Sequence, residues 1–243
     1  MRCLVTYALR RSGQHAIINW ICRQSGYNIH LNNVDILSYD GNLRVANYII
    51  YKHGIPVVSK YDRYKKVRFD ALGFPDLRDF DLCVMSFEDA FPQTIDYIYR
   101  RAGYLPKEVT TSVIIRDPYN LFASRLQTYG GLWKPHREEK AYTIQGMWNN
   151  HATICLTPNK YMMPLIPIKF NNWVSDQCYR KDLAEKLNLE FTDRGIYEVP
   201  LHGTSSFSDS DVLNRWKIKS KEVKALIDKE TAYKSQQLFG DII

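Results

Sequence analysis

Residues 2–20 read RCLVTYALRRSGQHAIINW, and this stretch decides the fold of the 243-residue chain. An almost unbroken apolar run over residues 3–9 is typical of a strand that is buried on both faces of a parallel sheet. From Gln14 onward the apolar residues, among them Ile17 and Ile21, follow the spacing of a helix. The stretch therefore predicts a central strand, a tight loop and a helix, in that order.

The loop between this strand and this helix, RRSG at residues 10–13, has the geometry that directs backbone N–H groups toward an anion. A helix N-terminus leaves its first N–H groups unpaired and carries a partial positive charge, so phosphate groups bind there readily. Gly13 permits close approach of the backbone, Ser12 can cap the helix or donate a hydrogen bond, and Arg11 adds a charge with a bidentate fork. The Walker A patterns GxxxxGKS and GxxxxGKT occur nowhere in the chain. The loop is thus a candidate anion site, and an ordinary structural turn is the alternative interpretation.

Composition places the chain among ordinary globular proteins. Hydrophobic residues make up 45% of the chain and charged residues 24%, which argues against disorder. The length fits a single α/β domain over residues 1–243 that buries its own core. The net charge of +7 favours anionic ligands, from nucleotides to acidic glycans, and does not choose between them.

Cysteine usage and hydropathy bear on the compartment. The five cysteines are odd in number and show neither CxxC nor Cys/His ligand spacing, so we expect reduced thiols and no metal site. No apolar run approaches the length of a membrane span, and Met1 leads directly into the first strand without a signal peptide. These observations predict a cytoplasmic protein without a membrane span.

The middle of the N-terminal half is less informative. Residues 27–31 are a candidate short strand and residues 55–59, IPVVS, a plausible one, whereas residues 32–52 have no firm assignment. Residues 60–66 mix basic and aromatic side chains that could stack bases and neutralise phosphates. Such a short segment is more typical of a solvated loop with snorkelling side chains, so we do not expect a nucleic-acid partner.

A third buried strand, DLCVMSF at residues 81–87, ends in two carboxylates, Glu88 and Asp89. Open α/β sheets keep their ligands at the carboxyl ends of their strands, so both residues are candidates for chemistry. The alternative is that they begin the next helix, predicted over residues 91–102, because acidic residues favour a helix N-terminus. Glu88 is the stronger candidate because it lies closer to the end of the strand.

The second informative segment is TSVIIRDPYNLFASRLQT, residues 111–128. It predicts a short strand followed by a helix, with Asp117 as the N-cap and Pro118 as the first helical residue. Arg116 is left at the carboxyl end of the strand, and Ser124 follows eight residues later. In a parallel sheet both would point toward the same cleft, although Arg116 could also simply pair with a carboxylate.

Taken together, RRSGQHA and VIIRDPYNLFASR resemble the sulfotransferases that depend on 3′-phosphoadenosine-5′-phosphosulfate (PAPS). In that family the first loop, typically Pro-Lys-Ser-Gly-Thr-Thr, holds the 5′-phosphosulfate, while an Arg at a strand end and a Ser eight residues later hold the 3′-phosphate. The strand at residues 165–170 and the helix at residues 181–189 are also similar to late elements of the family. The resemblance implies an α/β three-layer sandwich with a central parallel sheet and a P-loop-like phosphosulfate-binding loop. Residues 32–78 lie outside it.

The resemblance also implies a set of donor-binding residues. It comprises Arg10, Arg11, Ser12, Gly13, Gln14, His15, Ala16, Arg116 and Ser124. Arg11 stands where many members have a catalytic Lys, and its high pKa makes it a poor proton donor, so we expect an electrostatic catalyst. Gln14 and His15 replace two hydroxyl residues, and the imidazole of His15 either binds phosphate or packs.

The C-terminal part departs further from the family, whose Arg-Lys-Gly loop is absent. HGTSSF at residues 202–207 stands in its region, and Ser205 and Ser206 are the candidates that would close over the nucleotide. Beyond it, Ser208 and Asp211 form a capping box that predicts a further helix.

The function that the resemblance implies is transfer of a sulfuryl group from PAPS to a hydroxyl or amine of a small-molecule or glycan acceptor, without a metal. Such a reaction needs a base, for which Glu88 is the first candidate and Asp62 and His15 are weaker ones. One alternative is a phosphoryl-transferring kinase on a related scaffold, which the missing Lys-Ser/Thr pair disfavours. Another is a nucleotide-binding module without turnover, which the departures at Arg11 and His15 favour. The sequence identifies neither the acceptor nor the oligomeric state.

Overall fold

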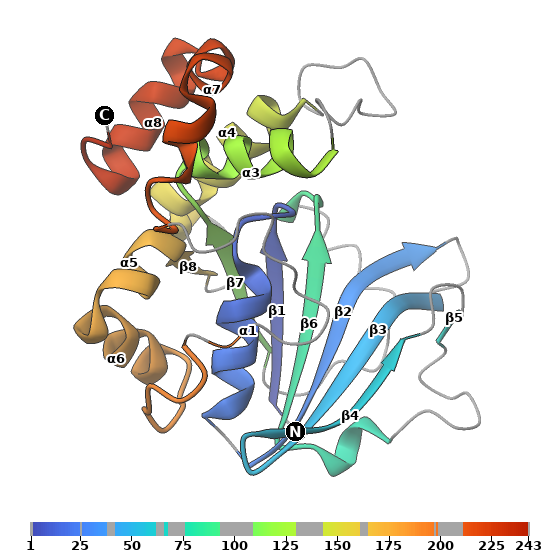
Figure 1. Ribbon diagram of the computed structural model, residues 1–243. Coiled ribbons are helices and arrows are strands. Elements are labelled where there is room, and N and C mark those ends of the chain that lie inside the picture. Colours follow the sequence, from blue (N-terminus) through green and yellow to red (C-terminus); the bar gives the residue numbers. More distant parts are fainter. Residues whose placement is uncertain are drawn as a thin grey trace.

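The computed structural model shows three layers, with one sheet between two groups of helices (Figure 1). This α/β architecture confirms the predicted fold class. The structure describes residues 2–24, 26–37, 42–61, 66–67, 76–92, 109–129, 143–160, 165–196, 198 and 211–242.

Eight strands form one sheet in the described part of the chain. They are β1 (Arg2–Ala8), β2 (Tyr27–Leu37), β3 (Asn42–Lys52), β4 (Ile55–Tyr61), β5 (Lys66–Val67), β6 (Leu82–Glu88), β7 (Val109–Ile115) and β8 (Leu165–Lys169). The order is β4-β3-β2-β6-β1-β7-β8, with β5 paired to β3. Strands β2, β6, β1, β7 and β8 run parallel, whereas β3, β4 and β5 add an antiparallel extension at one edge. The predicted central strand, β1, therefore lies in the middle of the parallel part.

Two of the helices predicted from local sequence signals begin at the expected residues, Gln14 and Pro118. The described helices are α1 (Gln14–Arg23), α3 (Pro118–Tyr129), α4 (Ile144–Leu156), α5 (Phe170–Ser175), α6 (Gln177–Lys186), α7 (Ser220–Leu226) and α8 (Lys229–Phe239), with 3-10 turns η1 (Leu77–Asp79), η4 (Pro158–Lys160) and η5 (Arg215–Lys219). Helix α3 begins at Pro118 as predicted, and the Asp117 carboxylate accepts from the Asn120 backbone N–H at 2.8 Å. Helix α6 begins earlier than predicted because Asp176 caps it. The helix predicted over residues 91–102 falls largely outside the described residues.

The core has two halves because the side chains of β1 alternate between the faces of the sheet. Cys3, Val5 and Tyr7 pack on one face with residues of α3, α4 and α8. Leu4 and Ala8 pack on the other face with residues of α1, α5 and α6. This confirms that the first strand is buried on both faces.

In the segment without a firm assignment, residues 32–37 complete β2 and residues 42–52 form β3, which pairs with β2 in the antiparallel direction. Along β2, Ile29 and Leu31 enter the core, but the alternate residues Asn28 and His30 are polar and also buried. After Leu31 the apolar face continues at Val34 and not at Asn33, whose φ is 51°. This change of phase interrupts the alternation by which a strand is found in a sequence. The sheet is consequently mixed, and larger than the parallel sheet that was predicted.

Candidate functional site

The loop that joins β1 to α1 lies at the carboxyl ends of the parallel strands. The Ser12 N–H donates to the Leu9 carbonyl at 3.0 Å, and both Arg11 and Gly13 have positive φ, 74° and 86°. Helix α1 begins at Gln14, and its N-cap residue, Gly13, has no side chain that could accept from the first-turn N–H groups.

Gly13 is required by packing as well as by backbone conformation. A Cβ at this position would lie 2.2 Å from Cε2 of Phe170, the first residue of α5. The Phe170 ring also lies beneath Arg116, whose Cζ is 4.8 Å from the ring centroid. One aromatic ring therefore fixes the loop relative to the buried arginine, a role that sequence reasoning missed.

Buried polar atoms without partners converge on this loop. Ser12 is 1% exposed and Arg116 is 3% exposed, yet the Ser12 Oγ and the Arg116 Nε have no hydrogen-bond partner among the described residues. A buried donor without an acceptor costs free energy, so such atoms need an explanation. Both atoms can donate a hydrogen bond, and an anionic ligand with oxygen acceptors would satisfy them.

Arg116 belongs to a group of three arginines, with Arg11 and Arg215. Its Nη1 donates to the Arg11 carbonyl at 3.3 Å, and its Nη2 donates to the Val212 carbonyl at 2.6 Å. Burial lowers the pKa of Arg116 to about 10; the charge of Asp117 opposes this shift, while the charges of Arg215 and Arg11 add to it. Burial and the charge of Arg11 likewise lower the pKa of Arg215. Mutual repulsion of this kind favours a bound anion.

Arg215 is placed here by a contact between distant segments. The Asn120 amide donates to the Leu213 carbonyl at 2.8 Å, and the Trp216 N–H donates to the Asn120 Oδ1 at 3.1 Å. The α-helix predicted after Asp211 is instead a turn followed by η5, because the Asp211 carboxylate accepts from the Leu213 N–H and so closes a short turn. Sequence reasoning missed Arg215, since no local signal links it to α3.

Glu88 forms a second cluster beside the loop, next to Ala8 at the end of β1. Its Oε2 accepts from the Arg10 Nε at 3.1 Å; its Oε1 accepts from the Gln14 amide and lies 3.4 Å from the His15 Nε2. Burial raises the pKa of Glu88, but the hydrogen bonds and charges of His15 and Arg10 outweigh it and hold the pKa below its usual value. Glu88 is therefore an ionised carboxylate.

His30 of β2 completes this cluster. It lies within the short strand that the sequence indicated, but no motif identified it as a site residue. Its ring centroid is 6.4 Å from that of His15, and its Nε2 lies 2.9 Å from the Ser86 Oγ. Burial, and secondarily the charge of His15, lower the pKa of His30 to about 3. His30 is neutral at physiological pH.

The loop is anchored to the sheet by a buried ion pair. The Asp89 Oδ1 accepts from the Arg10 N–H at 3.0 Å and from the Arg125 Nη2, while the Arg125 Nε donates to the Arg10 carbonyl at 3.1 Å. The sequence suggested Asp89 either as a group for chemistry or as the start of a helix; the described contacts instead use its carboxylate to hold the loop. Arg125, which had no sequence signal, carries the other half of this anchor.

The remaining predicted residues are placed as follows. Ser124 is 3% exposed on α3, whose Thr128 hydroxyl accepts from the Arg11 Nη2 at 2.6 Å. Ala16 lies in the first turn of α1, where its N–H donates to the Gly13 carbonyl at 3.1 Å. Three predicted residues, Ser205, Ser206 and Asp62, lie outside the described residues.

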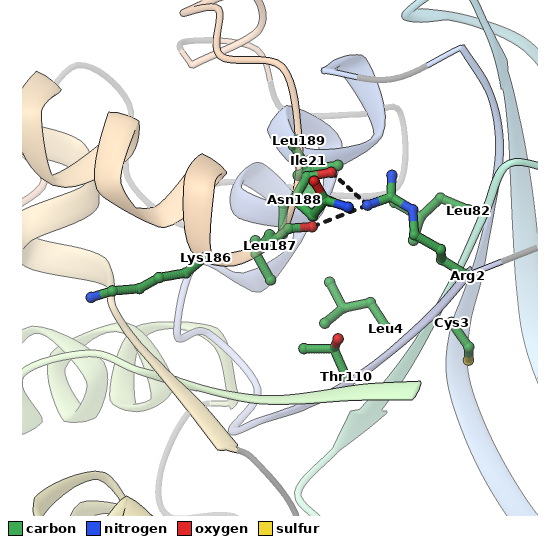
Figure 2. Close-up of a pocket in the computed structure, with 10 residues that line it drawn as sticks. All are labelled: Arg2, Cys3, Leu4, Ile21, Leu82, Thr110, Lys186, Leu187, Asn188 and Leu189. Carbon is green, nitrogen blue, oxygen red and sulfur yellow. Dashed lines mark hydrogen bonds between the residues drawn. The ribbon is translucent and has the colours of Figure 1, made fainter. Parts of the chain in front are cut away.

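A cavity of about 110 Å³ lies at the opposite end of β1 (Figure 2). Arg2, Cys3 and Leu82, at the amino ends of β1 and β6, help to line it. The Arg2 guanidinium donates to the Leu187 and Asn188 carbonyls just after α6, so its role there is structural. This cavity is separate from the loop.

Two further properties concern the described residues alone. None of their helices combines the length and the apolar character needed to cross a membrane. Nowhere among them do three His, Cys, Asp or Glu side chains lie close enough together to hold a metal ion.

No protein-family model matches the chain, and no curated protein matches it. Among solved structures, it is similar to the sulfotransferase domain of the olefin synthase from Synechococcus PCC 7002, with 13% identity and a TM-score of 0.40. It is also similar to the sulfotransferase domain of the curacin biosynthetic pathway, with 19% identity and a TM-score of 0.36. Each match covers 65% of this chain, and 59% and 62% of the other chains, respectively. Sequence identities and TM-scores this low do not establish a function.

The contact between Gly13 and Phe170 gives a first prediction. We expect Gly13→Ala to lower the free energy of unfolding by about 2–3 kcal/mol, because it adds both positive-φ strain and overpacking. Urea unfolding measures this loss. In a Phe170→Leu background the loss of unfolding free energy caused by Gly13→Ala should be smaller. The control is Gly240→Ala, because Gly240 also has a positive φ, 72°, but a Cβ there would have nothing within 4 Å. The effect of Gly240→Ala on the unfolding free energy should add independently to that of Phe170→Leu. Strict additivity of Gly13→Ala and Phe170→Leu would contradict the contact.

The anchor gives a second prediction. Asp89→Asn leaves the charge of Arg125, whose side chain is 8% exposed, without its carboxylate. We expect a loss of about 3–5 kcal/mol in unfolding free energy, since a buried charge is left uncompensated. The matched control is Asp76→Asn, which breaks an exposed ion pair with Arg78 and should leave the urea midpoint unchanged. Equal effects of the two variants would show that the anchor is not buried in solution.

Proposed function

We propose that this chain transfers a sulfuryl group from PAPS to a hydroxyl or amine of a small-molecule or glycan acceptor. The observation that carries the proposal is the pair of buried, unpartnered donor atoms, the Ser12 Oγ and the Arg116 Nε. They belong to two adjacent groups that are proposed to bind anions: the loop before α1, and the three arginines, to which the loop residue Arg11 also belongs. A nucleotide with phosphates at both its 5′ and 3′ positions suits two such groups better than ATP, whose phosphates all belong to one chain at the 5′ position.

Each part of the donor has proposed ligands. The loop and the first turn of α1, residues 10–16, would hold the 5′-phosphosulfate through the Ser12 hydroxyl and through backbone N–H groups other than those of Arg10, Ser12 and Ala16, which donate within the protein. Arg116 and Ser124 would hold the 3′-phosphate, and Arg215 joins them as a ligand suggested by its position. Ser205 and Ser206 would close over the nucleotide.

The chemistry asks the protein mainly for positioning and charge. Sulfuryl transfer is an in-line displacement, like phosphoryl transfer, so the leaving phosphate oxygen gains negative charge as the bond to sulfur breaks. Arg11 and the N-terminus of α1 would stabilise that charge. Glu88 would supply the negative charge that draws the proton from the acceptor, either directly or through His15.

Donor binding is tested by calorimetric titration with 3′-phosphoadenosine-5′-phosphate (PAP), the spent donor. We expect PAP to bind more tightly than magnesium ATP, and both Arg116→Ala and Arg215→Ala to weaken PAP at least about tenfold by removing charge-assisted hydrogen bonds. Arg78→Ala, at an exposed arginine paired with Asp76, is the control and should leave the affinity unchanged. Tighter binding of magnesium ATP would favour the kinase alternative, and absence of PAP binding would refute the proposal.

Ser12→Ala separates binding from folding. Because the Ser12 Oγ has no partner within the described structure, its removal should leave the free energy of unfolding unchanged or slightly higher, while the affinity for PAP falls about tenfold. The control is Ser235→Ala, which removes another buried hydroxyl without a described partner, on α8. Like Ser12→Ala, it should leave the free energy of unfolding unchanged or slightly higher, but it should not weaken PAP binding. If both variants bind PAP as the wild type does, Ser12 is not a ligand.

A further inference from the structure

We infer that His15, held in place by Glu88, is the group that takes the proton from the acceptor. This inference rests on the proposed function and assigns its base. His15 is the second residue of α1, directly after the loop, and its Nε2 lies 3.4 Å from the Glu88 Oε1. Its side chain is 24% exposed against 12% for Glu88, so an acceptor reaches the imidazole more readily than the carboxylate.

Glu88 is better suited to position His15 than to accept the proton itself. Both of its oxygens are occupied, Oε2 by Arg10 and Oε1 by Gln14 and His15. A general base works best when its pKa lies near the operating pH, and the pKa of Glu88 is held below the usual carboxylate value. Histidine, in contrast, is the side chain that exchanges protons near neutral pH.

The other groups that face His15 agree with this division of roles. From β2 it faces His30, which burial keeps neutral and which the Ser86 hydroxyl contacts at 2.9 Å. From β6 it faces Glu88, and the charge of Arg10 lies beyond that carboxylate. Glu88 thus provides the negative charge that stabilises an imidazolium at His15.

The step balances without a further reactant. The acceptor oxygen or nitrogen forms a bond to sulfur, and the bond from sulfur to the bridging phosphate oxygen breaks, leaving its electron pair on the phosphate. The Nε2–H of His15 faces Glu88, so Nδ1 takes the acceptor proton and later releases it to solvent. No atom is oxidised or reduced.

His15 has one competing role, as a ligand of the donor phosphate. The two roles differ in what they affect, since a phosphate ligand contributes to PAP affinity, whereas a base contributes to the rate and hardly to affinity. The test therefore measures PAP affinity by calorimetry and, with water as the acceptor, the rate at which radiolabelled PAPS releases sulfate.

We expect His15→Asn to slow sulfate release about a hundredfold while PAP affinity stays within about threefold of the wild type. Glu88→Gln should slow sulfate release about tenfold at unchanged PAP affinity, because the imidazole loses the carboxylate that positions it, and Glu88→Asp, which keeps a carboxylate, should restore part of the rate. The matched control, Glu198→Gln, changes a carboxylate that pairs with Arg23 and should leave the rate unchanged.

Three results would overturn the inference: a tenfold loss of PAP affinity in His15→Asn, unchanged sulfate release in that variant, or unchanged sulfate release in Glu88→Gln. Failure of the proposed function is seen separately, because a wild-type protein that binds no PAP refutes it whatever the His15 and Glu88 variants show. In that case the assignment of a base falls with it.

Discussion

The site depends on one buried positive charge, the guanidinium of Arg116. Burial of an ion is costly, and here the cost is offset by carbonyls of Arg11 and Val212 and by the ring of Phe170. The Arg116 carbonyl in turn accepts from the Trp148 indole at 2.9 Å, which fixes the end of β7 against α4. These contacts bring together the first loop, α5 and the C-terminal segment, so the geometry around the loop follows from satisfying this single side chain.

Two adjacent residues of the loop serve two halves of the site. Arg10 contacts the carboxylates of Glu88 and Asp89 and so belongs to the acidic half, where a proton is proposed to be accepted. Arg11 contacts Thr128 and offers its carbonyl to Arg116, in the cationic half. A reaction that releases an anionic leaving group and a proton needs both halves side by side, and the short loop keeps them together.

The parts of this arrangement that could be predicted from the sequence are local. The buried strand, the loop before Gln14 and the cap at Asp117 are each encoded within a few residues. Of the strand that carries His30, only residues 27–31 could be indicated, because the side-chain alternation changes phase at Asn33. Arg215 could not be placed either, since it reaches the site through Asn120, almost a hundred residues away in sequence. Long-range hydrogen bonds of this kind leave no periodic signal.

The central claim is that Arg116, in the cationic half, binds a 3′-phosphate, and a comparison of two nucleotides tests it most directly. PAP and adenosine 5′-phosphate differ only in that group. The account predicts that the wild type binds PAP about a hundredfold more tightly by calorimetry, and that Arg116→Ala abolishes most of this difference. Equal affinity of the wild-type protein for the two nucleotides would contradict it.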